Sequence, residues 1–482
     1  MRATCAGAGV ALAAIFGLLV GGCEPVVNEK TAINRTNKAD PLAVASGLQK
    51  TARALEPTSA NTLAAEVPEP IAEADAGEAL ARFHKDLLAL ASGARRQPVT
   101  ILHFGDDHIT ADRFSSELRR LFQSRFGDAG RGLIMPAGAY RFHRADGIRL
   151  GLEGDWTSET VIGTPEGGFS LTGVRVLSTA AGDSMTLDVD GGFDTAEVTF
   201  AGGPDRGKAR VSIDGQAVDV PTRRKGTRLV RSLSQRPGTH IEIRALQSHG
   251  IAVTGITLGR KAAGIRYVNL GLPGADIDAL AGLDQALAGE ELRQLSPSLI
   301  VFNYGSVSAL NDSLDLAQYA ETATSLVRRI HSWSPGASIV VVGPPDTVRL
   351  PDYAGTAARD SDDTPCRALA VEEIDRYPQD LAAADPRLAR WHPPINMAAV
   401  RKIWRRVAAG EGAVFWDWQA MMGGDCSIHA WIYANPPLAQ RDHSLMTEAG
   451  YRRSAAALFQ RLVAGMTAQA ANAVSTTPTA AQ

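Results

Sequence analysis

A chain of 482 residues is longer than one ordinary hydrophobic core needs, so its length favours two or more domains. Lysine and arginine nearly balance aspartate and glutamate, and the formal net charge is -3 at pH 7. This balance argues against a nucleic-acid partner, which would call for a basic surface. The function must therefore be sought in the motifs along the chain.

The first 22 residues have the pattern of a secretory signal. An apolar run over residues 9–20 follows Met1-Arg2, and it is too short and too rich in Gly and Ala for a membrane span. The sequence Val20-Gly21-Gly22-Cys23 resembles the bacterial lipobox, in which the cysteine is lipidated and becomes the mature N-terminus. We expect a signal peptide over 1–22 and a lipid anchor at Cys23 on the periplasmic side of the envelope, with Glu24 favouring the outer membrane. An uncleaved anchor, or an ordinary signal with a chance cysteine, is the alternative.

Residues 23–75 show no sustained apolar period and are expected to form a lipidated flexible tether. Removal of the signal and acylation of Cys23 would leave two cysteines, Cys366 and Cys426. In an oxidising periplasm these two can form a disulfide between two late loops. Two free buried thiols are the alternative, because spacing alone does not test geometry.

Residues 76–148 have the pattern of a first part of an α/β domain. A short amphipathic helix is expected over 78–90, and a buried strand over 99–104. Gly105 ends the strand, and Asp106, Asp107 and His108 follow it in a tight turn. Apolar residues then recur at intervals of three and four over 114–126, which predicts a helix. The three polar side chains thus stand at the carboxyl end of a strand, where α/β sheets bind ligands.

Residues 149–259 change to short alternating runs separated by turns rich in Gly, Asp and Pro. Such evenly spaced strands predict an antiparallel β-sandwich. Trp156 is the only tryptophan in this segment, and a lone aromatic residue is more often part of a core than a sugar-binding platform.

After residue 259 the α/β pattern returns over 260–465, and residues 466–482 are expected to be a disordered tail. Strands are predicted over 265–270, 299–304, 338–342 and 413–418, and helices over 275–287, 316–330, 396–409 and 447–463. Alternating strands and helices imply an α/β fold with a doubly wound parallel sheet, interrupted by the antiparallel β-sandwich.

The turn Gly105-Asp106-Asp107-His108 strongly resembles the first signature block of the SGNH (GDSL-type) hydrolases, which reads Gly-Asp-Ser-His in bacterial members. Residues 126–132, Phe-Gly-Asp-Ala-Gly-Arg-Gly, match a segment that follows in those members. The resemblance covers most of residues 95–465 and is greatest to bacterial peptidoglycan or carbohydrate O-acetylesterases. It implies a flavodoxin-like α/β/α domain, with a carbohydrate-module-like β-domain inserted where residues 149–259 lie.

The resemblance also implies a Ser nucleophile, a His base, an Asp that orients the His, and hydrogen-bond donors for the oxyanion. Asp107 stands in the place of the Ser. In the second block Gly271 is the candidate donor, with a plain turn glycine as the alternative. The third block reads Tyr304-Gly305-Ser306-Val307, so Val307 replaces the donor Asn, and Asn311 lies four residues further on.

The last block of the family has a His three residues after the Asp. Here Thr447, Gly450 and Tyr451 fix the register, so that Asp442 is retained and Leu445 occupies the His position. His443 is next to Asp442, but an offset of two residues displaces its side chain by several ångströms. His443 acting as the base is kept as the alternative.

The loss of kcat that each replacement causes in a triad enzyme decides whether esterase activity is expected. Removing Ser or His from such a triad costs on the order of 10⁶ in kcat, and these losses do not add. Losing one oxyanion donor costs about 10²–10³. With Ser, His and Asn all replaced, ordinary esterase chemistry is not expected.

Three roles for the acidic turn are left open. Asp107 could attack as a carboxylate nucleophile, beside Asp106. Asp106, Asp107 and His108 could gather a cation, although consecutive residues rarely converge on one metal. Asp107 could also be solvated, or cap the helix that follows.

We expect an envelope lipoprotein with a degenerate SGNH-like site. Asp107, Asp442 and His443 are its candidate catalytic residues, and its pocket residues are Asp106, His108, Gly271, Tyr304 and Gly305. We expect no cofactor and no metal. The expected role is binding an acetylated glycan or peptidoglycan, or an envelope protein partner. An active O-acetylesterase or acyltransferase with non-standard residues is the alternative.

Overall fold

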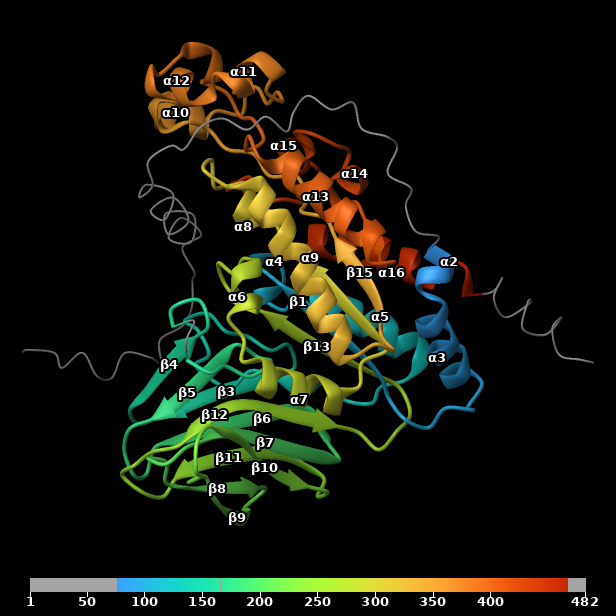
Figure 1. Ribbon diagram of the computed structural model, residues 1–482, viewed down its shortest axis with the longest axis vertical. Helices are drawn as coiled ribbons and strands as arrows, with labels where there is room; N and C mark the ends of the chain where they lie inside the picture. Colours follow the sequence, from blue (N-terminus) through green and yellow to red (C-terminus); the bar gives the residue numbers. More distant parts are fainter. Residues whose placement is uncertain (1–75, 165–166, 467–482) are drawn as a thin grey trace, which may run out of the picture.

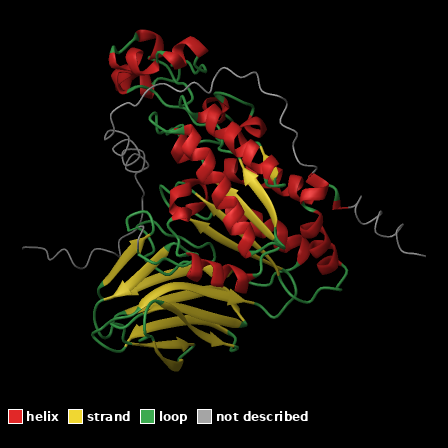
Figure 2. Cartoon of the chain, in the orientation of Figure 1, coloured by secondary structure: helices red, strands yellow, loops and turns green. Residues whose placement is uncertain are grey.

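The computed structural model of the protein describes residues 76–164 and 167–466. The predicted signal peptide, the lipid anchor at Cys23, the tether and nearly all of the predicted tail lie outside these residues. The described part is a mixed α/β structure with one parallel sheet and two antiparallel sheets (Figures 1 and 2), which confirms the sequence prediction at this level. Within the described ranges, no helix has the length and apolar character needed to cross a membrane.

The parallel sheet has five strands in the spatial order β13-β1-β14-β15-β16. Counted along the chain this order is 2-1-3-4-5, which occurs in doubly wound α/β sheets. Every residue of β1, β14 and β15 is buried, as expected for parallel strands covered on both faces. The strands span β1 Val99–Gly105, β13 Ile265–Gly271, β14 Leu299–Asn303, β15 Ser338–Val342 and β16 Val414–Trp416.

Helices cover both faces of this sheet, because alternate strand residues point to opposite sides. Leu102 and Phe104 of β1 belong to one apolar cluster, whereas Val99 and Ile101 belong to another. The helices of the first cluster are α6 Ile277–Ala281, α7 Gln285–Leu295, α9 Leu316–Trp333 and α13 Met397–Gly410. Those of the second are α3 Ala81–Ala91, α5 Phe114–Phe126, α14 Trp418–Met422, α15 Ser427–Ile432 and α16 Glu448–Val463, and α2 Ala76–Ala79 precedes α3.

The two antiparallel sheets form a β-sandwich between α5 and β13, at the bottom of Figure 1. One sheet has the order β10-β7-β12-β5-β4 with β2 paired to β12, and the other has the order β3-β6-β11-β8-β9. Apolar side chains of both sheets share one core with the first helical face. The strands are β2 Gly132–Ile134, β3 Ile148–Glu153, β4 Trp156–Thr160, β5 Val174–Ser178, β6 Ser184–Phe193, β7 Thr195–Gly202, β8 Lys208–Ile213, β9 Gln216–Pro221, β10 Arg228–Ser234, β11 Gly238–Ala245 and β12 Ala252–Gly259.

The structure differs from the sequence prediction at several boundaries. β2 already belongs to the antiparallel sheet, although the sequence assigns its residues to the α/β part. The helix expected over 275–287 is divided into α6 and α7, because Asp284 begins a new helix by accepting the backbone N–H groups of Ala286 and Leu287. The strand expected over 413–418 ends at Trp416, since Asp417 caps α14.

Trp156, the only tryptophan of the segment 149–259, is only half-buried, and its indole N–H donates to the Glu153 carbonyl.

A group of short helices between β15 and α13, which we call the crown (residues 343–395), has no counterpart in the sequence prediction. It lies at the end of the molecule opposite the sandwich (Figure 1). Its elements are η3 Asp352–Ala354, α10 Gly355–Asp360, α11 Val371–Asp375, α12 Tyr377–Ala382 and η4 Pro386–Leu388. These helices are three to six residues long, too short to show the apolar repeat that identifies longer helices.

Candidate functional site

Strand register brings the signature blocks together at the carboxyl edge of the parallel sheet. Gly105 of β1 is aligned with Gly271 of β13 on one side and with Asn303 of β14 on the other. The segments that follow these three residues therefore leave the sheet at the same level. This edge is where α/β sheets place their ligands.

Asp106 begins the short helix α4, Asp107–Thr110, and is completely buried. Its Oδ1 accepts the backbone N–H of His108 at 3.1 Å, so Asp106 is the N-cap of the helix. The Ser306 side chain and backbone N–H also interact with this carboxyl group. Burial, together with the neighbouring charge of Asp107, raises the pKa of Asp106 to about 8. This carboxyl group is therefore mostly protonated at neutral pH.

Asp107 occupies the first helical position of α4, so the suggestion that Asp107 caps the helix is wrong and Asp106 has that role. The Asp107 Oδ2 accepts the backbone N–H of Gly274 at 3.1 Å. Burial raises the pKa of Asp107, and the hydrogen bond from Gly274 acts in the opposite direction. The carboxylate thus has a fixed amide partner at the sheet edge.

The backbone N–H that donates to Asp107 belongs to Gly274, whereas Gly271, the candidate oxyanion donor, has a different partner. The N–H of Gly271 instead donates to Oδ1 of Asn269 at 2.8 Å. A Cβ atom on Gly271 would lie 2.4 Å from Cγ1 of Ile109, so glycine is needed there for close packing against α4. Gly274 has a φ of +67°, which favours glycine for a conformational reason.

The third block forms the start of α8, Ser306–Ala309, after β14. Tyr304 is buried, and Gly305 has a φ of +116° and lies against Val400 and Trp404 of α13. Val307 is half-buried and its side chain offers no donor. Ser306, next to it, is buried, and its side chain and backbone N–H both interact with the Asp106 carboxyl group and lower the pKa of that group.

The last block lies in the turn before α16. Asp442 Oδ1 accepts the backbone N–H groups of Ser444 and Leu445, both at 2.9 Å. Burial raises the pKa of Asp442. Burial raises the pKa of Tyr451, and the charges of Asp442 and Asp106 raise it further, so the first and last blocks approach one another around this tyrosine. Leu445 is half-buried and has no group that could transfer a proton.

His443 turns away from the sheet edge and joins the crown. Its Nδ1 donates to the Arg441 carbonyl at 3.0 Å, which leaves Nε2 to accept from Nδ1 of His429 at 3.0 Å. Its ring stacks on that of Trp391 with centroids 3.6 Å apart. Burial lowers the pKa of His443 to about 4. Both ring nitrogens are therefore engaged away from Asp107.

His108 is a core residue in this arrangement. Its Nδ1 and the Tyr451 hydroxyl are hydrogen-bond partners at 3.3 Å, and its ring packs against Trp418. Burial lowers the pKa of His108 to about 4. Across the described residues, no three side chains of His, Cys, Asp or Glu converge in a way that could hold a metal ion.

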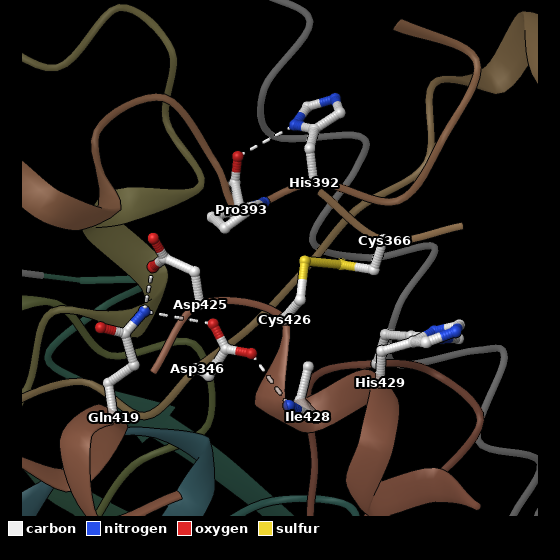
Figure 3. Close-up of a disulfide and its surroundings, with 10 residues drawn as sticks. Asp346, Cys366, His392, Pro393, Gln419, Asp425, Cys426, Ile428 and His429 are labelled. Atoms are coloured by element: carbon white, nitrogen blue, oxygen red, sulfur yellow. Dashed lines mark hydrogen bonds between the residues drawn. A yellow bond between two sulfur atoms is a disulfide. The ribbon is translucent and has the colours of Figure 1, made fainter. Parts of the chain in front are cut away.

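A disulfide between Cys366 and Cys426 fixes the crown to the start of α15 (Figure 3). Beneath it, the buried Asp346 accepts hydrogen bonds from the Ile428 backbone N–H at 2.9 Å and from the Gln419 side chain at 3.2 Å. The crown is thus joined by covalent and polar contacts to the segment that carries His429. This anchoring explains why His443 is held out of the site.

Two residues at the site were missed by the sequence analysis. Gly274 was visible as the second glycine of its block, but only the geometry tells which glycine faces Asp107. Tyr140 donates from its hydroxyl to the Thr110 carbonyl at the end of α4, and Asp107 contributes to raising its pKa. Tyr140 comes from the loop before β3, and no motif signals its approach.

Comparisons with known proteins agree with this architecture. No protein-family model and no curated protein matches the chain. Among solved structures, a peptidoglycan O-acetylesterase has a TM-score of 0.65 at 25% identity, covering 82% of this chain and 99% of that one. A lipase/acylhydrolase from Enterococcus faecalis (TM-score 0.26, 15% identity, 42% and 76% coverage) and a GDSL-like lipase from Parabacteroides merdae (TM-score 0.26, 16% identity, 42% and 74% coverage) also match. The chain thus shares its fold with the peptidoglycan O-acetylesterase over most of both chains, which agrees with the SGNH/GDSL-like resemblance of its motifs.

Proposed function

We propose that this protein is a non-catalytic member of its superfamily that binds an acetylated glycan of the cell envelope. The observation that carries the proposal is the hydrogen bond between the Asp107 carboxylate and the Gly274 amide. In an acyl-transfer enzyme such an amide must be free to receive the negative charge that develops on the substrate oxygen. Here a side chain of the protein itself already supplies that negative oxygen.

The absence of a proton acceptor at Asp107 supports the same reading. Leu445 holds the His position, and the ring nitrogens of His443 are bonded to Arg441 and His429. Attack by Asp107 would give an acyl anhydride, and no imidazole among the described residues contacts Asp107 to activate the water that must hydrolyse it. The alternative function, an active O-acetylesterase or acyltransferase, would need an imidazole to activate this water.

The ligand class is proposed from the similarity to the peptidoglycan O-acetylesterase, which extends over 82% of this chain. A superfamily member that has lost its nucleophile and base can still recognise the glycan through surfaces outside the reacting atoms. An envelope protein partner is the competing ligand, and the binding experiment below separates the two.

The envelope location is proposed from the N-terminal pattern, namely a signal over 1–22 and a lipid anchor at Cys23. The disulfide between Cys366 and Cys426 supports it, because such bonds persist in oxidising compartments such as the periplasm.

Purified protein is expected to hydrolyse p-nitrophenyl acetate no faster than the Asp107→Ala variant. The His443→Ala variant should hydrolyse at the same background rate but melt at a lower temperature, since it loses the stacking on Trp391. Spectrophotometric rates and thermal unfolding test both. A wild-type rate well above background that falls on either substitution would establish the active-enzyme alternative.

Binding is tested by sedimentation with insoluble peptidoglycan, either O-acetylated or chemically de-acetylated. We expect the protein to pellet with the acetylated material and much less with the de-acetylated material. If neither is bound and a specific envelope protein is captured instead, the ligand is a protein and the glycan proposal fails.

A further inference from the structure

A groove of about 810 Å³ lies beside the candidate site. It is lined by residues of three segments, 111–123, 143–150 and 448–452, so it begins directly after α4, the helix of Asp107. Tyr140, which bonds to the end of α4, belongs to the loop that leads into the second segment. At its other end the groove reaches Ile148 and Arg149 of β3, an edge strand of the β-sandwich. It therefore connects the site to the sandwich.

The lining of the groove contains six arginines and four carboxylates. Three of the arginines account for all four carboxylates: Arg119 pairs with Asp112 and Asp146, Arg120 with Glu117, and Arg452 with Glu448. The groove thus keeps a positive charge after its internal ion pairs are made.

The three remaining arginines are exposed. Arg113 and Arg144 make no ion pair with any described residue. Arg149 has a side chain that is 80% exposed, and its contact to Asp188, at 3.5 Å, is the long and exposed kind that contributes little. Together these residues present three guanidinium groups that are exposed and at most weakly paired, along a groove that begins next to α4.

We propose that this groove binds a carboxylate-bearing segment of the glycan, an inference that rests on the proposed function and names the chemistry of its ligand. A guanidinium presents two parallel N–H donors that match the two oxygens of a carboxylate. The carboxylates can come from uronic acid sugars or from the peptide stems of peptidoglycan. An anionic membrane surface is the less suitable occupant, because a flat bilayer cannot follow a groove between α5, β3 and α16.

The test measures affinities of the full-length protein for three soluble probes by calorimetry: a uronate hexasaccharide, a disaccharide-tetrapeptide from peptidoglycan, and neutral hexa-N-acetylchitohexaose. We expect an anionic probe to bind better than the neutral one, and its affinity to fall as salt is raised. The uronate and peptide-bearing probes distinguish the two sources of carboxylate.

The decisive variant replaces Arg113, Arg144 and Arg149 together with Gln. Three exposed ion contacts correspond to a loss of about tenfold in affinity for the anionic probe. The matched control replaces Arg223, Lys225 and Arg228 with Gln, which removes the same charge from exposed positions in the β9–β10 region and should change the affinity less than twofold. Because all six side chains are exposed, thermal unfolding should be unchanged in both variants.

The outcomes separate this inference from the proposed function. Equal binding of neutral and anionic probes, or an unchanged affinity in the groove variant, overturns the groove while glycan binding stands. Failure to bind any glycan, in solution or as insoluble peptidoglycan, overturns both. Binding that is limited to vesicles containing an anionic lipid assigns the arginines to a membrane and also overturns the inference.

Discussion

A chain carrying Asp107→Ser, Val307→Asn and Leu445→His is expected to hydrolyse p-nitrophenyl acetate about 10²-fold or more faster than the unmodified protein. A complete Ser-His-Asp unit contributes on the order of 10⁶ to kcat, so the expected gain is a small part of what a refined site supplies. Spectrophotometric initial rates of purified protein measure it.

The physical reason is that the scaffold keeps the parts these three residues would need. Asp107→Ser removes the carboxylate and frees the Gly274 amide, to which it is bonded at 3.1 Å, for the substrate oxygen. Asp442 accepts hydrogen bonds from the described residues only at Oδ1, so Oδ2 is available to orient a histidine at position 445. Position 307 lies at the start of α8, which follows β14. This strand pairs with β1, the strand that leads to Asp107.

Two controls make the result specific. Asp107→Ser alone should give no gain, because a hydroxyl without a base is not activated and the triad residues act as a unit. Adding Asp442→Asn to the triple variant should remove most of the gained activity, since the histidine loses its orienting carboxylate. A triple variant that folds with the wild-type melting temperature yet remains inactive would show that the scaffold no longer holds a productive geometry.

Much of the fold could be predicted because the longer elements are periodic. The apolar run of β1 follows from its burial on both faces of the sheet, and the three-and-four spacing in α5 follows from burying one face against a core. Both elements are therefore visible in the sequence. The crown could not be predicted, because its helices are held by the disulfide and by ion pairs such as that of Arg390 with Glu373. Such contacts join residues distant in sequence and leave no local pattern.

The candidate site, like the fold, could be predicted only in part. Motif register gives the identities of the residues at each position, and strand register brings Gly105, Gly271 and Asn303 side by side. The direction of a side chain or an amide within a loop depends on φ and ψ angles that the motif does not specify. For this reason the motif does not tell that the Gly274 amide donates to Asp107. It does predict that the side chain of His443 is displaced from the His position, but not that it stacks on Trp391 of the crown.

The Asp106→Asn variant is expected to gain stability relative to the wild type as pH rises from 5 to 7. The advantage should grow by about 2–3 kcal/mol, since each unit of pKa shift corresponds to about 1.4 kcal/mol. For a protein of this size that corresponds to an increase of roughly 2–4 °C in the difference between the two melting temperatures. Thermal unfolding followed by circular dichroism at pH 5, 6 and 7 measures it.

The direction of this change in stability follows from proton binding. The folded protein holds a proton on Asp106 up to a pKa of about 8, whereas the unfolded chain releases it near the ordinary value of 3.8. Between these values the folded state binds more protons, so raising the pH destabilises the wild type. Asparagine cannot ionise, and it caps α4 as well as aspartate does. The substitution therefore removes only the pH-dependent ionisation at position 106. The buried His108 adds stability as pH rises in this range, but it is present in both proteins and its contribution cancels in the difference.

A matched substitution separates this effect from a general benefit of asparagine. Asp315 caps α9 by accepting the N–H groups of Ala317 and Gln318, and it is exposed. Asparagine and aspartate cap helices about equally well, so Asp315→Asn measures the effect of the substitution at an exposed cap, and this effect is subtracted from that of Asp106→Asn at each pH. If the corrected advantage of Asp106→Asn does not grow from pH 5 to 7, Asp106 is ionised in the folded protein at neutral pH. A second negative charge would then stand beside Asp107 at the sheet edge, and the two carboxylates would disfavour an anionic ligand at the candidate site.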